Sequence, residues 1–317
     1  MDKKTSYTAA DIFPAKLAQR ANNCQFHGKI QPTHVQLCPT NKCNLNCSFC
    51  SCSDREKGQK LSIDRIAFLI SDMASLGTNA VTITGGGEPT LYPQIDRVIS
   101  MCNAKRIRVG LVTNGITLKN VHPQAIDSLS WCRISVSDDR DIDSLLPDLW
   151  CIIKASPHCD FAFSYVVTKD CDIAKIQEII NFANASKFSH IRLVSDLMDL
   201  DNVPDMESIK QQLSNDELVI YQGRKEYDAG SKRCLISLLK PVIAPDGYIY
   251  PCCGVQYATD DTGKFPEAMR MGRMEDIRNI YATQAFFDGS VCSKCYYKNY
   301  NDFLEVLTKN LDHMEFV

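Results

Sequence analysis

Residues 34–50 read HVQLCPTNKCNLNCSFC. The stretch begins with a short β-rich run, His34–Leu37, and continues directly into a loop rich in cysteine. The loop cysteines in C-x3-C-x2-C register are Cys43, Cys47 and Cys50. Three thiolates on one tight loop can hold three corners of a cubane iron–sulfur cluster and leave the fourth iron without a protein ligand. A zinc site is the alternative, because Cys38 or Cys52 is near enough in sequence to complete a set of four ligands. The segment therefore predicts a strand followed by a metal-binding loop.

The alternation of β-rich runs with amphipathic stretches continues as far as about residue 200. Strands are expected at 34–37, 80–84, 107–113, 132–137, 161–168 and 191–194. Helices are expected at 63–76, 92–103, 123–129, 144–154 and 173–185. The clearest helix begins after Ser62, a good N-cap, and ends at Gly77. Six β-α units in succession imply a parallel sheet with right-handed crossovers.

Composition and charge narrow the class of protein. The chain has 317 residues, enough for about two domains of roughly 150 residues each. It is 44% hydrophobic and 23% charged, which excludes a disordered or fibrous chain. A net charge of −3 creates no field that would attract nucleic acid or an anionic membrane. The sequence has no apolar signal segment and no long apolar run, so we expect a cytoplasmic protein whose 16 cysteines stay reduced and available for metal chemistry.

Polar motifs follow the next three predicted strands at the point where each strand ends. Gly85-Gly-Gly-Glu-Pro89 follows the second strand, and Thr113-Asn-Gly115 follows the third. Ser135 and Ser137 lie at the end of the fourth. The carboxyl ends of parallel strands meet at one edge of a sheet or barrel, so we expect these motifs to surround one site together with the cysteine loop.

Together these motifs resemble the radical S-adenosylmethionine (radical SAM) superfamily, whose signature is a C-x3-C-x-aromatic-C loop, here with Phe49 as the aromatic residue. The resemblance spans residues 34 to about 200. It implies an α/β fold, a partial (β/α)6 TIM-like barrel, with SAM and a [4Fe-4S] cluster bound at the cysteine loop. It also implies that the glycine-rich turn and the Glu88 carboxylate meet the methionyl amino group of SAM. The residues that it assigns to SAM binding are Phe49, Gly85, Gly86, Gly87, Glu88, Asn114, Ser135 and Ser137.

A second group of cysteines lies in the last third of the chain, where the β-α rhythm has ended. Its members are Cys234, Cys252, Cys292 and Cys295. Residues 241–250 predict a β-hairpin around Pro245-Asp-Gly247, and a last helix is expected at 301–311. Four thiolates from a hairpin and a C-x2-C pair can close a site around zinc, as in a zinc ribbon, or around an iron–sulfur cluster. Cys253, beside Cys252, is an alternative ligand.

The register of this second group resembles the twitch extension, a shortened SPASM domain in which radical SAM proteins carry one auxiliary [4Fe-4S] cluster. The further cysteines of a full SPASM domain do not follow, so the resemblance implies one auxiliary cluster. We therefore expect an N-terminal helical lead-in with a helix at 12–21, then a radical SAM barrel, then a small twitch-like domain with a β-hairpin and a helix. The bounds expected for the three parts are 1–33, 34–215 and 216–317.

The resemblance implies a radical reaction. A [4Fe-4S] cluster, reduced by a donor such as flavodoxin or ferredoxin, cleaves SAM to a 5′-deoxyadenosyl radical, which takes a hydrogen atom from the substrate. The substrate is then oxidised or rearranged with help from the auxiliary cluster. The 42 residues before Cys43 are too few for the leader-binding domain of many peptide-modifying relatives, so we expect a small-molecule or nucleotide-like substrate.

Other functions fit the same residues. A base in nucleic acid, as in phage-type thymine hypermodification, is one alternative substrate, although the net charge does not indicate it, and a peptide is another. A two-cluster electron carrier or a zinc-binding module is the non-enzymatic alternative. An electron carrier needs neither an open iron nor the glycine-rich motif, and this favours the enzyme.

Candidate substrate contacts lie on and beyond the last predicted strand. Arg192 and Asp196 are candidates for a catalytic role, and His190 lies beside them. Arg192 can pair with a carboxylate or a phosphate, or it can form a structural salt bridge. Further candidates near the hairpin are Tyr221, Arg224 and Tyr248. The remaining cysteines are expected to be packing residues, with a hydrogen-donor role open for Cys38 and Cys52.

Overall fold

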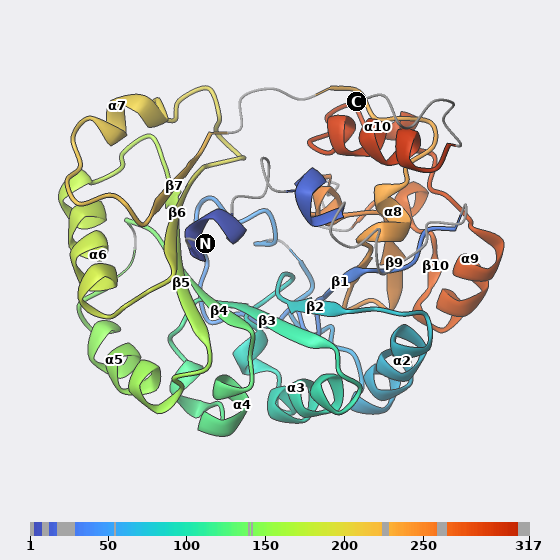
Figure 1. Ribbon diagram of the computed structural model, residues 1–317, viewed down its shortest axis with the longest axis horizontal. Helices are drawn as coiled ribbons and strands as arrows, with labels where there is room; N and C mark the ends of the chain where they lie inside the picture. The colour runs from blue at the N-terminus through green and yellow to red at the C-terminus, as the bar shows by residue number, and fades with distance from the viewer. Residues whose placement is uncertain are drawn as a thin grey trace.

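One ten-stranded sheet organises the computed structural model, which describes residues 3–7, 13–17, 29–53, 55–138, 140, 142–223, 228–258 and 265–309 (Figure 1). The strands are β1 (His34–Leu37), β2 (Ala80–Ile83), β3 (Arg108–Thr113), β4 (Trp131–Val136), β5 (Asp160–Val167), β6 (His190–Ser195), β7 (Val219–Gln222), β8 (Val242–Ile243), β9 (Tyr248–Tyr250) and β10 (Gly272–Arg273). Their order is β10-β9-β8-β1-β2-β3-β4-β5-β6-β7. Every pairing from β8 through β1 to β7 is parallel, and the β8–β9 and β9–β10 pairings are antiparallel. The sheet curls into an arc with two edges, so the barrel is not closed.

The fold is the α/β partial TIM-like barrel that the sequence predicts. All six predicted strands are present, each within one residue of the predicted bounds. The predicted hairpin is present as β8 and β9. Three features go beyond the prediction: β7 adds a seventh parallel strand at one edge, β8 pairs with β1 on the other side, and β10 pairs with β9. The C-terminal hairpin therefore continues the barrel sheet.

Helices α2 to α6 cover the convex side of the arc (Figure 1). The α-helices are α2 (Ile63–Ser75), α3 (Ile95–Ala104), α4 (Pro123–Asp127), α5 (Leu146–Ala155), α6 (Ile173–Ala185), α7 (Met206–Lys210), α8 (Ile236–Leu239), α9 (Ile277–Thr283) and α10 (Lys298–Leu307). The Ser62 hydroxyl caps α2 by accepting a hydrogen bond from the Arg65 N–H at 3.4 Å, as its sequence predicts. No helix in the described ranges is long and apolar enough to cross a membrane.

Some helix bounds differ from those predicted. The helix predicted at 92–103 begins at Ile95, because Pro89–Leu91 form a separate 3-10 turn before it. The last helix begins at Lys298, ahead of the prediction. The short helices α7, α8 and α9 are not predicted. The helix predicted at 12–21 is helical at 13–17, and its remainder lies outside the described residues.

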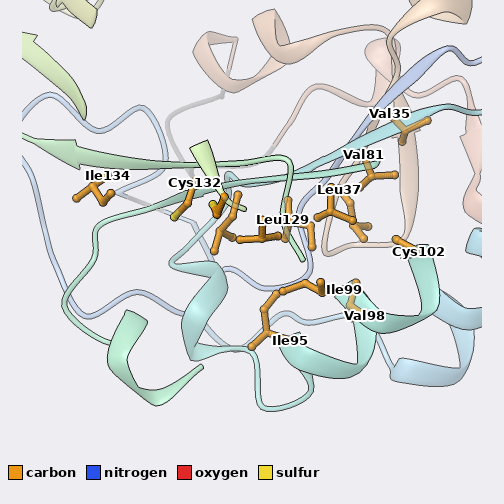
Figure 2. Close-up of a cluster of buried hydrophobic side chains, with 14 of the residues drawn as sticks. Val35, Leu37, Val81, Ile95, Val98, Ile99, Cys102, Leu129, Cys132 and Ile134 are labelled. Atoms are coloured by element: carbon orange, nitrogen blue, oxygen red, sulfur yellow. The ribbon is translucent and has the colours of Figure 1, made fainter. Parts of the chain in front are cut away.

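The hydrophobic core fills the space between the sheet and the outer helices. Figure 2 shows one face of α3 packed against the strands, with side chains that are all buried. The labelled residues are Val35, Leu37, Val81, Ile95, Val98, Ile99, Cys102, Leu129, Cys132 and Ile134. Cys102 and Cys132 are fully buried in this layer and behave as small packing residues, as expected.

The concave face of the same strands is polar. Successive side chains of a strand point to opposite faces. On β6, Ile191 and Leu193 join the core, so His190 and Arg192 face the barrel interior. The same alternation turns Arg133 of β4 inward. The interior of the arc is therefore lined with groups that can bind a polar ligand.

Aromatic rings fill the amino end of the barrel interior. The Trp131 ring lies against Gly110 of the neighbouring strand, and a Cβ atom on Gly110 would lie 2.2 Å from that ring. The 3-10 segment η1 (Lys3–Tyr7) lies inside the arc (Figure 1), and its Tyr7 ring stacks on His190 with a centroid separation of 4.3 Å. The opposite, carboxyl end of the strands carries the polar motifs.

Replacement of Gly110 by alanine tests the packing at the amino end of the barrel. The added methyl group would clash with the Trp131 ring, so we expect the free energy of unfolding to fall by about 1–3 kcal/mol. Gly58→Ala is the control, because a Cβ atom there meets nothing within 4 Å. Urea unfolding measures both variants, with near-ultraviolet circular dichroism to follow the tryptophan. Equal stability of the two variants would contradict the packing described here.

Candidate active site and cysteine clusters

The chain extends β1 past its end before it forms the cysteine loop. Residues 38–42 lie between the glycine-rich turn on one side and the returning end of the loop on the other. The Gly87 N–H donates to the Thr40 carbonyl at 2.8 Å, and the Asn41 N–H donates to the Gln59 carbonyl at 2.9 Å. A Cβ atom on Gly87 would lie 2.1 Å from a carbonyl oxygen of this segment. Glycine is therefore required for the close approach of the two backbones.

The three cysteines of the first loop, Cys43, Cys47 and Cys50, are half-buried, as is Phe49 between them. The Cys50 N–H donates to the Cys47 carbonyl at 3.1 Å and folds the loop back on itself. Within the described residues, no three His, Cys, Asp or Glu side chains are close enough together to hold one metal ion. A cubane cluster spreads its cysteine ligands over separate irons. The fit to such a cluster therefore rests on donor chemistry, three accessible thiols on one short loop.

Glu88 anchors the glycine-rich turn. It is 3% exposed, and its carboxylate accepts four hydrogen bonds. The donors are the Thr90 N–H and hydroxyl at 2.9 and 2.6 Å, the Thr113 hydroxyl at 2.6 Å and the Asn114 N–H at 2.7 Å. Three of these donors meet Oε1 and one meets Oε2, so Oε2 keeps a lone pair for a further donor. Glu88 thus ties the turn after β2 to the end of β3, and its contact with the SAM amino group stays a prediction.

The other predicted SAM contacts lie around the same opening. The Asn114 side chain donates to the Asn44 side chain at 2.7 Å and so joins the turn after β3 to the cysteine loop. Ser135 is half-buried at the end of β4. Ser137 is buried, and its hydroxyl has no hydrogen-bond partner among the described residues. A buried hydroxyl without a partner is unfavourable, which makes Ser137 a candidate for ligand contact.

Arg140 was not singled out from the sequence. It is 9% exposed, and its guanidinium donates to two backbone carbonyls, one at the end of β4 and one in the turn after β3. Burial lowers the pKa of Arg140, and three nearby groups oppose this effect. They are Cys47, Glu88 and Cys43. The positive charge of Arg140 therefore lies near both the Glu88 carboxylate and the first cysteines. Arg140 lies just after β4, the strand whose end carries the predicted SAM contacts. This position is the sequence signal that could have indicated it.

Two arginines of the barrel interior lie two strands apart. In the register of β5 between them, Ala162 pairs with Arg133 and Ser164 pairs with Arg192. Burial, together with these two cations, lowers the pKa of His190 to about 3. His190 is therefore neutral at neutral pH, and the positive charge of this wall comes from the arginines.

Arg192 also links the barrel wall to the second group of cysteines. Its guanidinium donates to the Gln222 side chain on β7. The Gln222 amide donates in turn to the Tyr296 hydroxyl at 3.5 Å. Tyr296 directly follows Cys295. A polar chain of contacts therefore runs from the interior of the barrel to the C-x2-C pair.

The remaining predicted contacts are dispersed. Asp196 is buried after β6, where its carboxylate accepts the Met198 N–H at 2.8 Å. The Tyr221 hydroxyl donates to a carboxylate of the segment before β7. Tyr248 stacks against two arginines of the C-terminal part, away from the predicted SAM motifs. Arg224 lies outside the described residues.

Short backbone pairings hold the second group of cysteines. The Cys234 N–H donates to the Phe287 carbonyl at 3.1 Å, and the Cys295 N–H donates to the Asp228 carbonyl at 2.6 Å. Both are antiparallel bridges. The segment that carries Cys234 therefore lies beside the segment that carries the C-x2-C pair.

The four predicted thiols of this group lie near one another. Burial, with the thiols of Cys295 and Cys292 nearby, raises the pKa of Cys234 to about 12. Burial also raises the pKa of Cys252, with further contributions from Cys253, Cys234 and Cys295. Metal ligation requires thiolates, so a bound metal has to displace these protons. The group matches a closed four-thiolate site in donor type, which zinc and iron–sulfur clusters share.

Cys252 and Cys253 make different contacts. The Cys252 sulfur accepts the Gly254 N–H at 3.3 Å and interacts with the other cysteines of the second group. The Cys253 sulfur lies 3.3 Å from the Tyr297 hydroxyl. The choice between Cys252 and Cys253 as ligand stays a prediction, because Cys253 also lies beside the other thiols. Cys38 is buried, and burial raises its pKa to about 12.

Comparison with known sequences places these motifs in a family. The family model of the radical SAM superfamily matches residues 37–137. A probable GTP 3′,8-cyclase of Sulfolobus acidocaldarius is 30% identical over 173 residues, 50% of this chain and 55% of that protein. A probable GTP 3′,8-cyclase of Methanococcus maripaludis is 33% identical over 107 residues, 33% of this chain and 35% of that protein. The chain thus spans about a third to a half of the length of these curated relatives.

Solved structures share the fold over most of the chain. Streptococcus suis SuiB bound to the precursor peptide SuiA has a TM-score of 0.62 at 15% identity, covering 92% of this chain and 77% of that one. The protein anSMEcpe with bound AdoMet and the Cp18Cys peptide has a TM-score of 0.53 at 13% identity, covering 90% and 86%. At such identities the likeness concerns the fold alone. The match to the radical SAM superfamily model includes the cysteine loop, the glycine-rich turn and β4, so the similarity spans the predicted SAM motifs.

Proposed function

We propose that this protein is an enzyme that cleaves SAM at a [4Fe-4S] cluster held by Cys43, Cys47 and Cys50. The observation that carries the proposal is the open set of three thiols beside the glycine-rich turn, within a radical SAM domain. A closed structural metal site would use four ligands. The electron would come from a donor such as flavodoxin or ferredoxin.

When bound, a reduced [4Fe-4S] cluster supplies the electron that cleaves the SAM sulfonium, and the resulting 5′-deoxyadenosyl radical takes a hydrogen atom from the substrate. The chain's own residues bind and orient the reactants. Glu88 fixes the turn beside which SAM would lie. Arg140 supplies a buried cation for the SAM carboxylate or for thiolates of the loop. The Ser137 hydroxyl is available for a further contact.

The substrate that the barrel interior fits best is an anionic small molecule, such as a nucleotide. Arg133 and Arg192 line the interior, and a neutral His190 lies near both. Arginine binds phosphate and carboxylate groups with two parallel hydrogen bonds. The names of the relatives, probable GTP 3′,8-cyclases, support a nucleotide-like substrate. Asp196, which follows the strand that carries Arg192, is a further catalytic candidate.

The second cysteine group is proposed to hold one auxiliary [4Fe-4S] cluster on Cys234, Cys252, Cys292 and Cys295. The contacts from Arg192 through Gln222 to Tyr296 support a place for it beside the substrate wall. A cluster at this place would accept an electron from the substrate, or it would hold the substrate in position. A zinc ion on the same four thiolates is the alternative that metal analysis distinguishes.

Serine replacement of the first three cysteines together tests the SAM-cleaving site. After anaerobic reconstitution, the triple variant is expected to lose about four irons per chain and all reductive SAM cleavage, because the cluster loses its ligands. Cys151→Ser is the matched control, since Cys151 is exposed on α5. Iron analysis and detection of 5′-deoxyadenosine after dithionite give the readouts. A triple variant that still forms 5′-deoxyadenosine would refute the assignment.

A double replacement, Cys292→Ser with Cys295→Ser, tests the second site separately. We expect iron to fall by about four atoms per chain while SAM cleavage persists, because the first loop is intact. The measurements are iron, zinc and 5′-deoxyadenosine. Zinc rather than iron in the unmodified protein would exclude the auxiliary cluster and leave the first site untouched.

Charge removal in the barrel tests the substrate class. Arg133→Met and Arg192→Met are each expected to weaken GTP binding about tenfold or more, since a hydrogen bond to a charged group contributes about 1.5–3 kcal/mol. Arg108→Met is the control, because Arg108 is exposed at the start of β3. Isothermal titration calorimetry under anaerobic conditions measures the dissociation constants. If the three variants bind GTP alike, the inward arginines do not hold the anion.

A further inference from the structure

A cavity of about 270 Å³ lies outside both cysteine groups. Its walls are the returning end of the cysteine loop, the turn between β8 and β9, and the segment after residue 264. None of the seven proposed metal-ligating cysteines lines it. The cavity adjoins the glycine-rich turn, because a Cβ atom on Gly86 would lie 2.6 Å from the side-chain oxygen of Asn41 and 3.4 Å from Pro245, both of which line the cavity. None of the predicted SAM contacts is itself among the lining residues.

Arg55 is buried in the wall of this cavity without a polar partner. It is 6% exposed, and none of its three side-chain nitrogens finds a hydrogen-bond acceptor within the part of the chain that the structure describes. Its guanidinium carbon lies 3.9 Å from the centroid of the Phe265 ring. Stacking occupies the face of the guanidinium and leaves its N–H groups free in the plane. A buried charge of this kind is unfavourable until an anion pairs with it.

Two neighbours of Arg55 also present unused polar atoms. Asn41 is buried, and its side-chain oxygen has no partner among the described residues. The Nε atom of Arg270 likewise lacks one, and the Arg270 guanidinium lies 4.1 Å from the centroid of the Tyr248 ring. The cavity therefore offers donors on two stacked guanidinium groups.

The acidic side chains that line the cavity are already engaged. Asp246 accepts the Tyr248 N–H at 3.1 Å and the Tyr250 hydroxyl at 2.6 Å. Glu267 pairs with Arg270 at 2.7 Å, and Glu56 accepts the Gln59 side chain at 2.9 Å. None of these carboxylates forms a salt bridge with Arg55 in the described structure. These carboxylates therefore leave Arg55 without an ion pair among the described residues of the cavity, and the thiol of Cys52 lies near enough to interact with its charge.

We propose that this cavity binds the oxyanion group of a small ligand, a phosphate or a carboxylate, with Arg55 as the main donor and Arg270 as the second. The planar guanidinium fork matches both groups. The volume is slightly below the usual range for small-molecule sites, which fits a small anion or one end of a metabolite. Bound there, the anion would join the cysteine-loop return to the C-terminal hairpin.

Calorimetric titration of the full-length, cluster-loaded protein tests the site. Inorganic phosphate and acetate are the two probes, each at matched ionic strength in potassium chloride. We expect one of the two to bind the unmodified protein and Arg55→Met to weaken that binding about tenfold or more. Arg55→Lys keeps the charge without the fork and should bind with intermediate affinity. Arg273→Met is the control, because Arg273 also lies near the Tyr248 ring but does not line the cavity.

Thermal unfolding provides an independent readout. Without anion, Arg55→Met should be at least as stable as the unmodified protein, because methionine removes an unpaired buried charge and keeps the packing. The anion should raise the melting temperature of the unmodified protein and of Arg273→Met, and leave that of Arg55→Met unchanged. Saturating SAM should leave anion binding intact.

Three outcomes would overturn the proposal. The first is that neither phosphate nor acetate binds the unmodified protein. The second is that the anion binds Arg55→Met as tightly as the unmodified protein. The third is that SAM abolishes anion binding, which would assign the anion to the SAM site. Loss of SAM cleavage would disprove the proposed enzyme but leaves this test intact, since the cavity shares no residue with the first cysteine group.

Discussion

The buried carboxylate of Glu88 holds the carboxyl end of the barrel together. A charged group with so little exposure is stable only when donors surround it, and here Thr90, Thr113 and Asn114 supply them. Asn114 then continues the connection by its hydrogen bond to Asn44 of the cysteine loop. The cysteine loop, the glycine-rich turn and the end of β3 are thus joined through one ionised side chain.

The two faces of the curved sheet have different roles, core packing on the convex face and the proposed ligand site on the concave face. The convex face buries aliphatic side chains against α2 to α6 and provides most of the hydrophobic stabilisation. The concave face carries Arg133 and Arg192, and burial together with these two cations lowers the pKa of His190 and keeps it neutral. Because strand residues alternate strictly between the faces, one strand can serve the core and the ligand site at the same time.

Much of this fold follows from local sequence patterns, and the exceptions have physical reasons. The six barrel strands are buried runs between turn residues, and Ser62 is a recognisable helix cap, so both are predictable. β7 is only Val219–Gln222, half of it partly exposed, and a run this short has no clear periodicity. The helices that were not predicted, α7, α8 and α9, are also short, with seven residues at most.

The candidate site divides in the same way. Cysteine spacing and the glycine-rich motif are local, so the sequence indicates them directly. Cys234 and the C-x2-C pair lie on neighbouring segments, while the shared site and its metal stay predictions. Arg140, Arg133 and Arg55 gain their meaning from burial and from strand register, which join segments far apart in the chain. His190, which the sequence places beside the candidate substrate contacts, is a neutral residue of the wall because burial and the two arginines lower its pKa.

The pairing of β8 with β1 has a consequence for the spacing between the two cysteine groups. The first cysteine loop extends from β1, and Cys252 follows β9 of the hairpin that begins with β8, so continuous backbone hydrogen bonds connect the two groups. Strands in such a ladder lie about 4.8 Å apart. The gap between the two cysteine groups is therefore set by a rigid lattice of strands, and changes in the length of the segment that joins the barrel to the hairpin would leave it unaltered.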